Sequence, residues 1–427
     1  MKILHTADLH LGQVIYQNYD RADEHEHFFK QLVKWCKDEQ PDALLVSGDV
    51  FDIQQPSAAT KKAFTDSFVN LHSACPQMKI VITAGNHDSA SRIQADSAVW
   101  KEVKVVLVGI APSIGASEEN WQDNYIVNLD SGYIIAMPYM NGDRREQLQS
   151  ILDRVAADNS EGKPVVLMEH LAVTGMDPTG HDYEIGTIKT QDATTLGSGY
   201  DYCALGHIHK PQTIGHQDDC METEITYPSG VVRYSGSALH VSCDEKYPHT
   251  VSVVTIEKHG GDVNIRQLRI NELRNFHELP EERDACFKSA DDALKKIKEF
   301  AEKYQRGYIR LRVDYNADLP SNFSNMVYDT LKTYNDEVRF NPKHIWIGKP
   351  EANANEDNKP VFEVAELQEM TNPYTFVEKT IAQYPGLNLD MVKEAFEEVE
   401  AEVIRLTEEG SKSKKGKKAK EVSTEEN

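Results

Sequence analysis

The sequence lacks the usual features of a secreted or membrane protein. No hydrophobic run approaches the roughly 20 residues that a helix needs to cross a bilayer. The N-terminal segment is already polar at His5, so it lacks the apolar core of a secretion signal. The six cysteines include no C-x-x-C pair, which argues against a zinc knuckle and against a dense disulfide framework. We therefore expect a cytoplasmic protein with reduced thiols and no membrane association.

Basic residues are also scarce relative to acidic ones. The formal net charge is −23 at pH 7, whereas proteins that bind nucleic acid unaided usually carry a basic excess. If DNA is the substrate, bound cations, local basic patches or a partner must offset the repulsion. The charge is thus the strongest compositional argument against a nucleic-acid enzyme that works alone.

The first part of the chain, residues 1–275, alternates short apolar runs with amphipathic helical patterns. Helices are predicted at 22–38 and 58–71, and buried strands at 2–6, 43–47, 79–83, 165–168 and 202–205. Strand–helix alternation indicates βαβ units and a mostly parallel sheet. The segments 222–237, 250–258 and 262–270 follow one another without a long helix, so we expect an antiparallel region there. The predicted fold class is α/β with mixed sheets.

The remaining chain divides into four segments. Residues 276–348 predict a small α+β capping domain, with helices at 289–304 and 322–334 and strands at 307–315 and 338–348. Residues 349–370 read as a linker, 371–408 as helices and 409–427 as a disordered Lys-rich tail. The apolar stripe of 387–406 is too short to be stable alone, so it must dock on a partner or pack back on the first domain.

Five polar segments follow the predicted strands. They are Asp8-Leu9-His10, Gly48-Asp49, Gly85-Asn86-His87-Asp88, His170 and Gly206-His207-Ile208-His209. In open α/β sheets the ligand site lies beyond the carboxyl ends of the strands, where such loops converge. We therefore expect these segments to meet at one site, although they are far apart in the sequence.

The residue types in these segments indicate two bound metal ions. The expected ligands are Asp8, His10, Asp49, Asn86, His170, His207 and His209. Oxygen and imidazole donors without sulfur suit manganese, iron or zinc. Seven ligands exceed the need of one ion, but two ions that share the Asp49 carboxylate would use them all. Two ions roughly 3.5–4 Å apart can activate a water and stabilise a phosphorus under attack.

The blocks D-x-H, G-D, G-N-H-D, H and G-H-x-H, in this order, resemble the signature of calcineurin-like metallophosphoesterases. More closely, the chain resembles the SbcD family of bacterial nucleases and their archaeal and eukaryotic counterparts. The matching segments are KILHTADLHLGQ, SGDVFD, AGNHDS, ALGHIHKPQ and YSGS. The resemblance is dense over 1–245 and extends to the later segments only in general layout. It implies a four-layer α/β/β/α sandwich for the first domain.

The resemblance also implies roles for single residues. One ion would be held by Asp8, His10, Asp49 and His209, and the other by Asp49, Asn86, His170 and His207. His87 would act on the phosphate, and Asp88 would orient His87. The cofactors would be two divalent cations, manganese in the first place and magnesium as the alternative.

The activity implied is 3′→5′ exonuclease action on double-stranded DNA, with endonuclease action on single strands and hairpins, in DNA recombination, replication and repair. The implied assembly is a homodimer that binds two copies of an SbcC-type ATPase through the C-terminal helices. Two alternatives stay open: a phosphodiesterase for a small nucleotide or phosphomonoester, and a non-catalytic scaffold for DNA ends.

Several further residues have competing interpretations. Glu169 stands where the family has a small residue, and strand alternation predicts that it faces away from the metals. Asp52 could shape a turn or position substrate, whereas Arg92, Arg144 and Arg145 could contact DNA or simply be solvated. The run Glu24-His25-Glu26-His27 resembles a metal site in composition, but residues two apart on a helix point to different faces.

Overall fold

A computed structural model describes residues 1–348 except 17–18, 114–118, 180–189, 217–222 and 283–284. The predicted linker 349–370, the helical segment 371–408 and the Lys-rich tail 409–427 lie outside the described residues. No helix among the described residues is long and apolar enough to cross a membrane.

The first sheet has seven strands, several of which are runs of buried Val, Ile and Leu. Its order is β12 (Ile225–Tyr227), β15 (Val263–Arg269), β14 (Thr250–Ile256), β1 (Lys2–Thr6), β4 (Ala43–Ser47), β5 (Lys79–Thr83) and β6 (Val105–Val108). Strands β1, β4, β5 and β6 are parallel, whereas β14 is antiparallel to β1, and β15 to β14. Because parallel strands end at the same edge, the loops after β1, β4 and β5 lie on one side.

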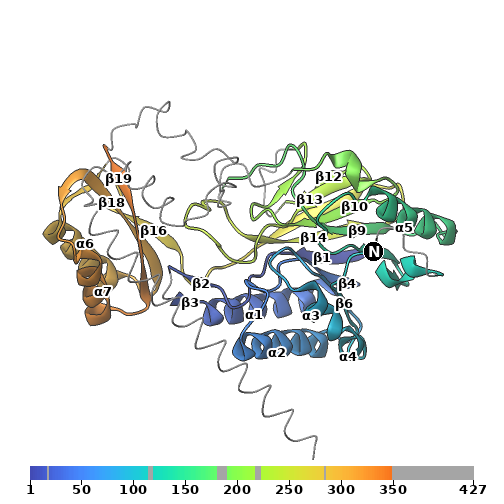
Figure 1. Ribbon diagram of the computed structural model, residues 1–427, viewed down its shortest axis with the longest axis horizontal. Helices are drawn as coiled ribbons and strands as arrows, with labels where there is room; N and C mark the ends of the chain where they lie inside the picture. The colour runs from blue at the N-terminus through green and yellow to red at the C-terminus, as the bar shows by residue number, and fades with distance from the viewer. Residues whose placement is uncertain (17–18, 114–118, 180–189, 217–222, 283–284, 349–427) are drawn as a thin grey trace, which may run out of the picture. The chain divides into compact units, whose positions relative to one another are not determined.

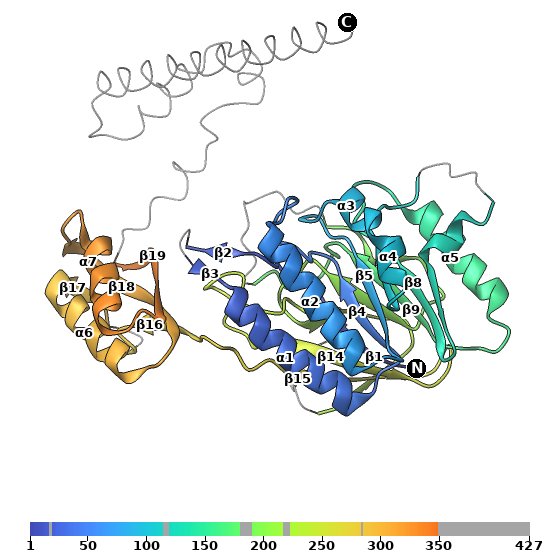
Figure 2. The same cartoon turned by 90° about the horizontal axis from the view of Figure 1, so that it is seen from below.

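Helices α1 (Ala22–Glu39) and α2 (Ala58–Ala74) cover one face of this sheet, together with the short helices α3 (Ala90–Ala95) and α4 (Ser97–Lys101) (Figures 1 and 2). Aromatic side chains such as Phe28 of α1 and Phe68 of α2 belong to the core cluster under this face. Ser57 caps α2, since its hydroxyl accepts a hydrogen bond from the Thr60 N–H at 3.1 Å.

The second sheet packs against the opposite face of the first. Its order is β11 (Gln212–Thr213), β13 (Val231–Tyr234), β10 (Tyr202–Gly206), β9 (Val165–His170), β8 (Gly132–Ala136) and β7 (Ile126–Leu129). One core cluster contains residues of both sheets, such as Leu45 and Leu167, and also Leu148 of α5 (Arg145–Asp158). Figure 1 shows α5 on the face of this sheet that points away from the first sheet.

Both sheets combine parallel and antiparallel pairs, so the prediction of a mixed α/β fold is confirmed. The predicted strands and helices of the first part are present within a few residues of their expected ends. The expectation of a wholly antiparallel region at 222–237 is wrong in part. The chain changes sheets between β12 and β13, and β13 pairs with β10 in parallel. Strands β6, β7 and β8 and helix α5 were not predicted.

The elements after residue 275 form a third, four-stranded sheet with its own core. They are β16 (Phe276–Leu279), β17 (Phe287–Ser289), α6 (Ala290–Lys303), β18 (Gly307–Asp318), α7 (Phe323–Tyr334) and β19 (Val338–Ile347). Strands β16, β17 and β19 all run parallel to their neighbour β18. Ile297 of α6 and Val327 of α7 pack with Ile309 of β18 in a separate hydrophobic cluster. Shorter elements elsewhere are β2 (Val14–Ile15), β3 (Tyr19–Asp20), η1 (Trp121–Tyr125) and η2 (Ala193–Leu196).

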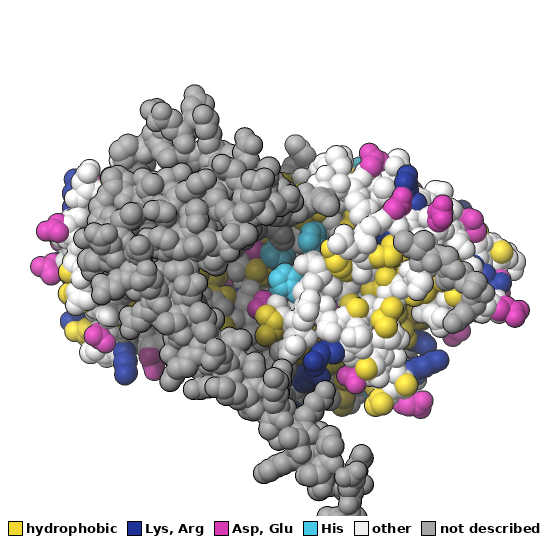
Figure 3. All heavy atoms as spheres, viewed as in Figure 1, with side chains coloured by type: hydrophobic (Ala, Val, Ile, Leu, Met, Phe, Trp, Pro, Cys, Tyr) yellow, Lys and Arg dark blue, Asp and Glu magenta, His cyan; other side chains and the backbone are white. Residues whose placement is uncertain are grey.

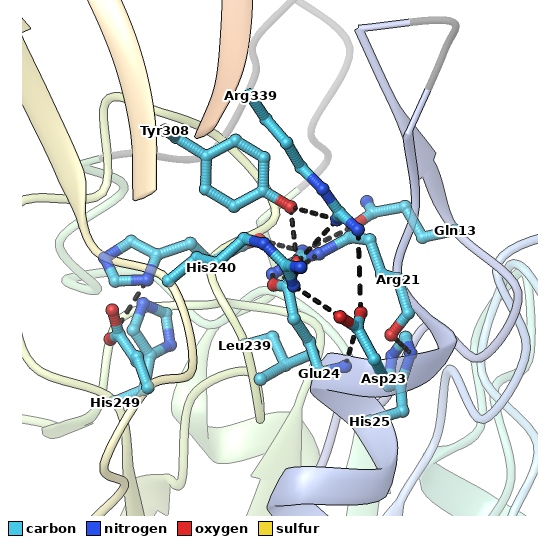
Figure 4. Close-up of polar contacts among 12 residues, drawn as sticks. Gln13, Arg21, Asp23, Glu24, His25, Leu239, His240, His249, Tyr308 and Arg339 are labelled. Atoms are coloured by element: carbon cyan, nitrogen blue, oxygen red, sulfur yellow. Dashed lines mark hydrogen bonds and ion pairs between the residues drawn. The ribbon is translucent and has the colours of Figure 1, made fainter. Parts of the chain in front are cut away.

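A buried polar network joins α1 to the third sheet (Figure 4). We call Arg21, Glu24, Arg274, Tyr308 and Arg339 the junction network. The Glu24 carboxylate, 2% exposed, lies 2.6 Å from Arg21 Nη2 and 2.9 Å from Arg339 Nη1, and it accepts a hydrogen bond from the hydroxyl of Tyr308. Glu24 is therefore a structural residue, and the metal-like run on α1 is not a metal site of the described residues.

Candidate metal centre

The five polar segments of the sequence meet at the carboxyl ends of the two sheets. Asp8, Asp49, Asn86 and His207 follow β1, β4, β5 and β10, and His170 is the last residue of β9. The His207 backbone N–H donates to the Asp8 carboxylate at 3.0 Å. Figure 3 shows histidine side chains that gather in one place on the molecular surface. The structure thus brings all seven expected ligands together.

Asp8, His10 and His209 form the first group of metal-binding side chains. One donor atom of each lies within 4.8 Å of the others, and all three residues are buried. His10 is 2% exposed, yet neither of its ring nitrogens has a hydrogen-bond partner among the described residues. A buried imidazole in this state is costly, and a cation that accepts its lone pair would remove the cost. The donor set therefore fits a divalent metal.

Asp49, His170 and His207 form the second group, again within 4.8 Å. The Oδ2 atom of Asp49 lies 3.3 Å from His170 Nε2. The side-chain oxygen of Asn86 lies 3.0 Å from His170 Nε2 and 2.9 Å from His207 Nδ1. His170 Nδ1 lies 2.8 Å from the Ser47 carbonyl oxygen, which fixes the ring and directs Nε2 to the group.

The loop conformations at this site are unusual for their residue types. Asp8, His10, Asp49 and His207 have φ values of 50°, 45°, 47° and 93°, which non-glycine residues rarely adopt. Such strain is concentrated at functional sites, where the fold over-determines it. Gly85 permits the close packing here, because a Cβ at this position would lie 2.1 Å from Asp49 Oδ1.

The charges of the two groups depend strongly on one another. Burial alone would raise the pKa of Asp49, but the positive charge of His170 outweighs it and holds that pKa below its usual range. Burial lowers the pKa of His170, but the Asp49 carboxylate outweighs burial and raises the pKa of His170 to about 9. Burial raises the pKa of Asp8. Two adjacent carboxylates in this buried position favour a bound cation.

His87 and Asp88 occupy different environments although they are neighbours. His87 is exposed, its ring lies 4.9 Å from that of His10, and its Nδ1 atom is 2.9 Å from the Asp52 carbonyl oxygen. The Asp88 carboxylate accepts hydrogen bonds from the backbone N–H groups of Val50, Phe51 and Gly85, at 3.1, 2.9 and 2.8 Å. The predicted contact between Asp88 and the His87 ring is not among the hydrogen bonds of the described residues. Asp88 instead ties together the loops after β4 and β5.

Glu245, which is 2% exposed, was not predicted as a site residue from the sequence. Its Oε1 atom lies 3.1 Å from His209 Nδ1. Burial raises the pKa of Glu245, but His209 and His249 outweigh burial and hold it below its usual range. A carboxylate behind a ligating imidazole orients the ring and increases its basicity. No local spacing marks Glu245, which lies in the stretch between the predicted segments 222–237 and 250–258 and not directly at a strand end.

Glu169 and Arg144 form a buried ion pair, with Arg144 Nη1 2.7 Å from Glu169 Oε2. The expectation that Glu169 faces away from the metal ligands agrees with this pairing. Arg144 is 1% exposed, so the hypothesis that it contacts DNA is wrong. Burial raises the pKa of Glu169 to about 7 even beside the guanidinium. The departure from the family pattern at Glu169 is thus accommodated by a specific partner.

Known proteins are similar to this chain over the part that contains the site. Residues 1–211 match the family described as Calcineurin-like phosphoesterase. The chain is 29% identical to the SbcD subunit of nuclease SbcCD from Rhodobacter capsulatus, over 60% of this chain and 66% of that protein. It is also 29% identical to the corresponding SbcD protein of Escherichia coli K12, over 59% and 65%. The alignments span just under two thirds of each relative.

One similar solved structure is that of TT1561 of Thermus thermophilus, with 14% sequence identity and a TM-score of 0.34, over 63% of this chain and 99% of that one. The family assignment does not depend on it. Residues 1–211, which contain every expected metal ligand, match the calcineurin-like phosphoesterase family.

Proposed function

We propose that the protein is the nuclease subunit of an SbcCD-type complex, a two-metal phosphodiesterase that cleaves DNA ends and hairpins. The observation that carries the proposal is the pair of buried donor groups, one around His10 and one around His170. Relatives named as the SbcD subunit of nuclease SbcCD support DNA as the substrate. The substrate, the 3′→5′ polarity and the role in DNA recombination, replication and repair are all part of the proposal.

In this proposal Asp8, His10, Asp49 and His209 hold one cation, and Asp49, Asn86, His170 and His207 hold the other. Mixed oxygen and imidazole donors suit Mn²⁺ better than they suit Mg²⁺, which typically binds in sites made of oxygen ligands alone. When bound, the pair supplies an activated water and Lewis-acid stabilisation of the phosphate. Asp49 is the proposed bridge, because its carboxylate is the member of the second group that has two oxygen donors.

His87 is the proposed acid for the leaving oxygen. Its ring is exposed, so it can reach a phosphate, while the neighbouring Asn86 points toward His170 and His207. His87 Nδ1 donates to the Asp52 carbonyl oxygen, so Nε2 is the nitrogen that can exchange a proton with substrate. Asp52 therefore orients the ring, a role that the sequence analysis assigned to Asp88.

The proposed assembly is supported by the net charge and by the similarity to SbcD subunits. The net charge of −23 favours a partner that helps to bind DNA, and the SbcC-type ATPase would bind through residues 371–408 of a homodimer. The four-layer sandwich over 1–275 is supported by the order of α1 and α2, the two sheets and α5 (Figure 1). The capping domain at 276–348 is supported by its separate core. A cytoplasmic location stays a prediction.

The test is cleavage by the purified full chain of an end-labelled duplex and a hairpin, with a small phosphodiester such as bis(4-nitrophenyl) phosphate alongside. We expect Mn²⁺-dependent DNA cleavage that a chelator stops. His87→Gln should lose about 10²–10⁴-fold in turnover but retain its bound metal. Rapid hydrolysis of the small ester without any DNA cleavage, alone or with the ATPase partner, would favour the small-substrate alternative. Equal DNA cleavage by His87→Gln would remove its assigned role.

A further inference from the structure

A third group of metal-binding side chains lies outside the candidate metal centre. His240, His249 and Glu272 each offer a donor atom, and these atoms lie within 4.8 Å of one another. The two rings lie side by side, with centroids 4.2 Å apart (Figure 4). His240 Nδ1 is 3.0 Å from Glu272 Oε1. None of the three belongs to the ligand set proposed for catalysis.

Among the described residues, His249, the buried member of this group, has a hydrogen-bond partner at only one of its two ring nitrogens. His249 is fully buried, and its Nδ1 atom is 2.9 Å from the Ser237 carbonyl oxygen. Its Nε2 atom has no hydrogen-bond partner among the described residues, and neither has Glu245 Oε2. These two atoms lie 3.2 Å apart without the geometry of a hydrogen bond. A buried imidazole nitrogen and a buried carboxylate oxygen that lie this close as an ion pair, without a hydrogen bond, are both suited to bind a cation.

We propose that His240, His249 and Glu272 form a zinc site, with Glu245 beside it. Two imidazoles and a carboxylate are a donor set that Zn²⁺ prefers. Ligand distances of about 2.0–2.2 Å require only a small closing movement of side chains that already lie within 4.8 Å. Calcium and magnesium are disfavoured, because they take oxygen ligands almost exclusively.

The ion has a route to the site. His240, Glu245 and Glu272 line a cavity of about 790 Å³ that Arg310 and Arg312 of β18 also line. The His249 ring, by contrast, is fully buried. The position therefore combines access from the cavity with a buried ligand, as a metal site needs.

The location indicates what the ion would do. Glu272 lies in the segment between β15 and β16 that leads into the third sheet, and the His240 ring packs on Phe276 of β16 at 5.1 Å. Glu245 contacts His209 of the metal centre through Oε1 and His249 through Oε2. A zinc ion here would fix the connecting segment to the loop that supports His209. Its role is structural, and it does not depend on the nuclease proposal.

The test is the number of zinc ions that the full chain retains. The protein is stripped with a chelator, equilibrated with buffered micromolar Zn²⁺, and analysed by inductively coupled plasma mass spectrometry. We expect three ions per chain for the wild type, two in the metal centre and one here. His240→Gln and Glu272→Gln should each retain two. His216→Gln, an exposed histidine outside all these groups, is the matched control and should retain three.

We expect Glu272→Gln to fold, because the Glu272 side chain is 14% exposed and its ion-pair partner among the described residues is His240. Zn²⁺ should also raise the melting temperature of the wild type more than that of Glu272→Gln, since the ion stabilises only the folded state. A folded Glu272→Gln or a folded His240→Gln that retains as many ions as the wild type would overturn the proposal, whatever the number of ions in the metal centre.

Discussion

The junction network and the candidate metal centre both bury several charged groups, but among the described residues only the junction has hydrogen-bond partners for all its buried polar side-chain atoms. At the junction, the Glu24 carboxylate meets Arg21 and Arg339, and Arg274 Nη1 lies 3.5 Å from it. Arg274 also pairs with the partly exposed carboxylates of Asp23 and Glu337. In the metal centre, by contrast, His10 has no hydrogen-bond partner for either ring nitrogen among the described residues. Burial of charge is common to both regions, and the missing hydrogen bonds distinguish the functional one.

This difference also explains why composition alone misleads. The run of Glu and His on α1 has the residue types of a metal site, yet Glu24 is saturated by arginines and His25 Nε2 faces the Leu9 carbonyl oxygen at 2.8 Å. The D-x-H block has fewer such residues, but within the described chain its histidine is held without a hydrogen bond to either ring nitrogen. Variants in the two regions should therefore fail in different ways.

The largest expected effect is in the metal centre. Asp49→Asn removes the proposed shared carboxylate and should reduce metal-dependent phosphodiester hydrolysis below detection, because both cations lose a ligand. The protein should still fold, as judged by circular dichroism, since Asn has the size of Asp49 and keeps an oxygen that can accept the hydrogen bond from the His87 backbone N–H. Asp66→Asn on the exposed face of α2 is the control and should be fully active. Near-normal turnover of Asp49→Asn would show that this carboxylate is not shared.

The junction should lose stability instead. Glu24→Ala leaves several guanidinium groups without their buried partner, which typically costs about 3–5 kcal/mol. We expect this loss in the free energy of unfolding measured with urea, with hydrolysis per folded molecule unchanged at low denaturant. Glu26→Ala, two positions along the same helix, removes only an exposed pair with Lys30 and should change stability by less than about 1 kcal/mol. Equal effects of the two substitutions would contradict a structural junction.

His5 is a buried residue outside both regions, and it shows the effect of burial on a side chain that remains uncharged in the folded protein. His5 on β1 is fully buried like His170, but burial, with the nearby charge of Arg233, lowers the pKa of His5 to about 3. The unfolded chain binds a proton at His5 as the pH falls through about 6.5, whereas the folded protein remains unprotonated there until about pH 3. Stability from His5 is thus fully present above its unfolded pKa and is lost as the pH falls toward its folded pKa.

Between pH 7 and pH 5 this loss amounts to about 2 kcal/mol. Urea unfolding at the two pH values should show a smaller decrease for His5→Gln than for the wild type, by about this amount. His216→Gln, whose side chain is exposed, should behave like the wild type. If His5→Gln kept the wild-type dependence on pH, the buried ring would have to be charged in the folded protein.

The sequence predicted those parts of the site that follow regular strands. Runs such as 43–47 and 79–83 are rich in aliphatic residues and end at polar ones, so the rule for strand ends placed Asp49 and Asn86 together. Gly48 beside Asp49 allows close packing, since a Cβ there would lie 2.1 Å from His170 Nδ1. Periodicity and strand order are enough to predict a site residue where that residue directly follows a regular strand.

Other features depend on contacts between segments that no local pattern connects. Arg144 precedes α5, and only the packing of α5 against β9 makes it the partner of Glu169. The partners of Asp88 are backbone N–H groups, which every loop offers, so the sequence could not distinguish them from the His87 ring. Glu245 lies 36 residues from His209, in an irregular segment that the two sheets bring back to the site.

Glu245 gives the smallest and most specific test of the contrast between the two regions. Its carboxylate belongs to neither ligand set of the proposed catalytic cations. It accepts a hydrogen bond from His209 Nδ1 and so directs the opposite ring nitrogen toward the metal centre. Glu245→Gln should weaken Mn²⁺ binding by about 10–100-fold, with turnover restored at saturating Mn²⁺. Asp244→Asn, the exposed neighbour that pairs with Arg310, should leave the affinity unchanged. Loss of turnover that added Mn²⁺ does not restore would place Glu245 in the chemistry itself, because a residue that only orients a ligand affects metal affinity and not the saturated rate.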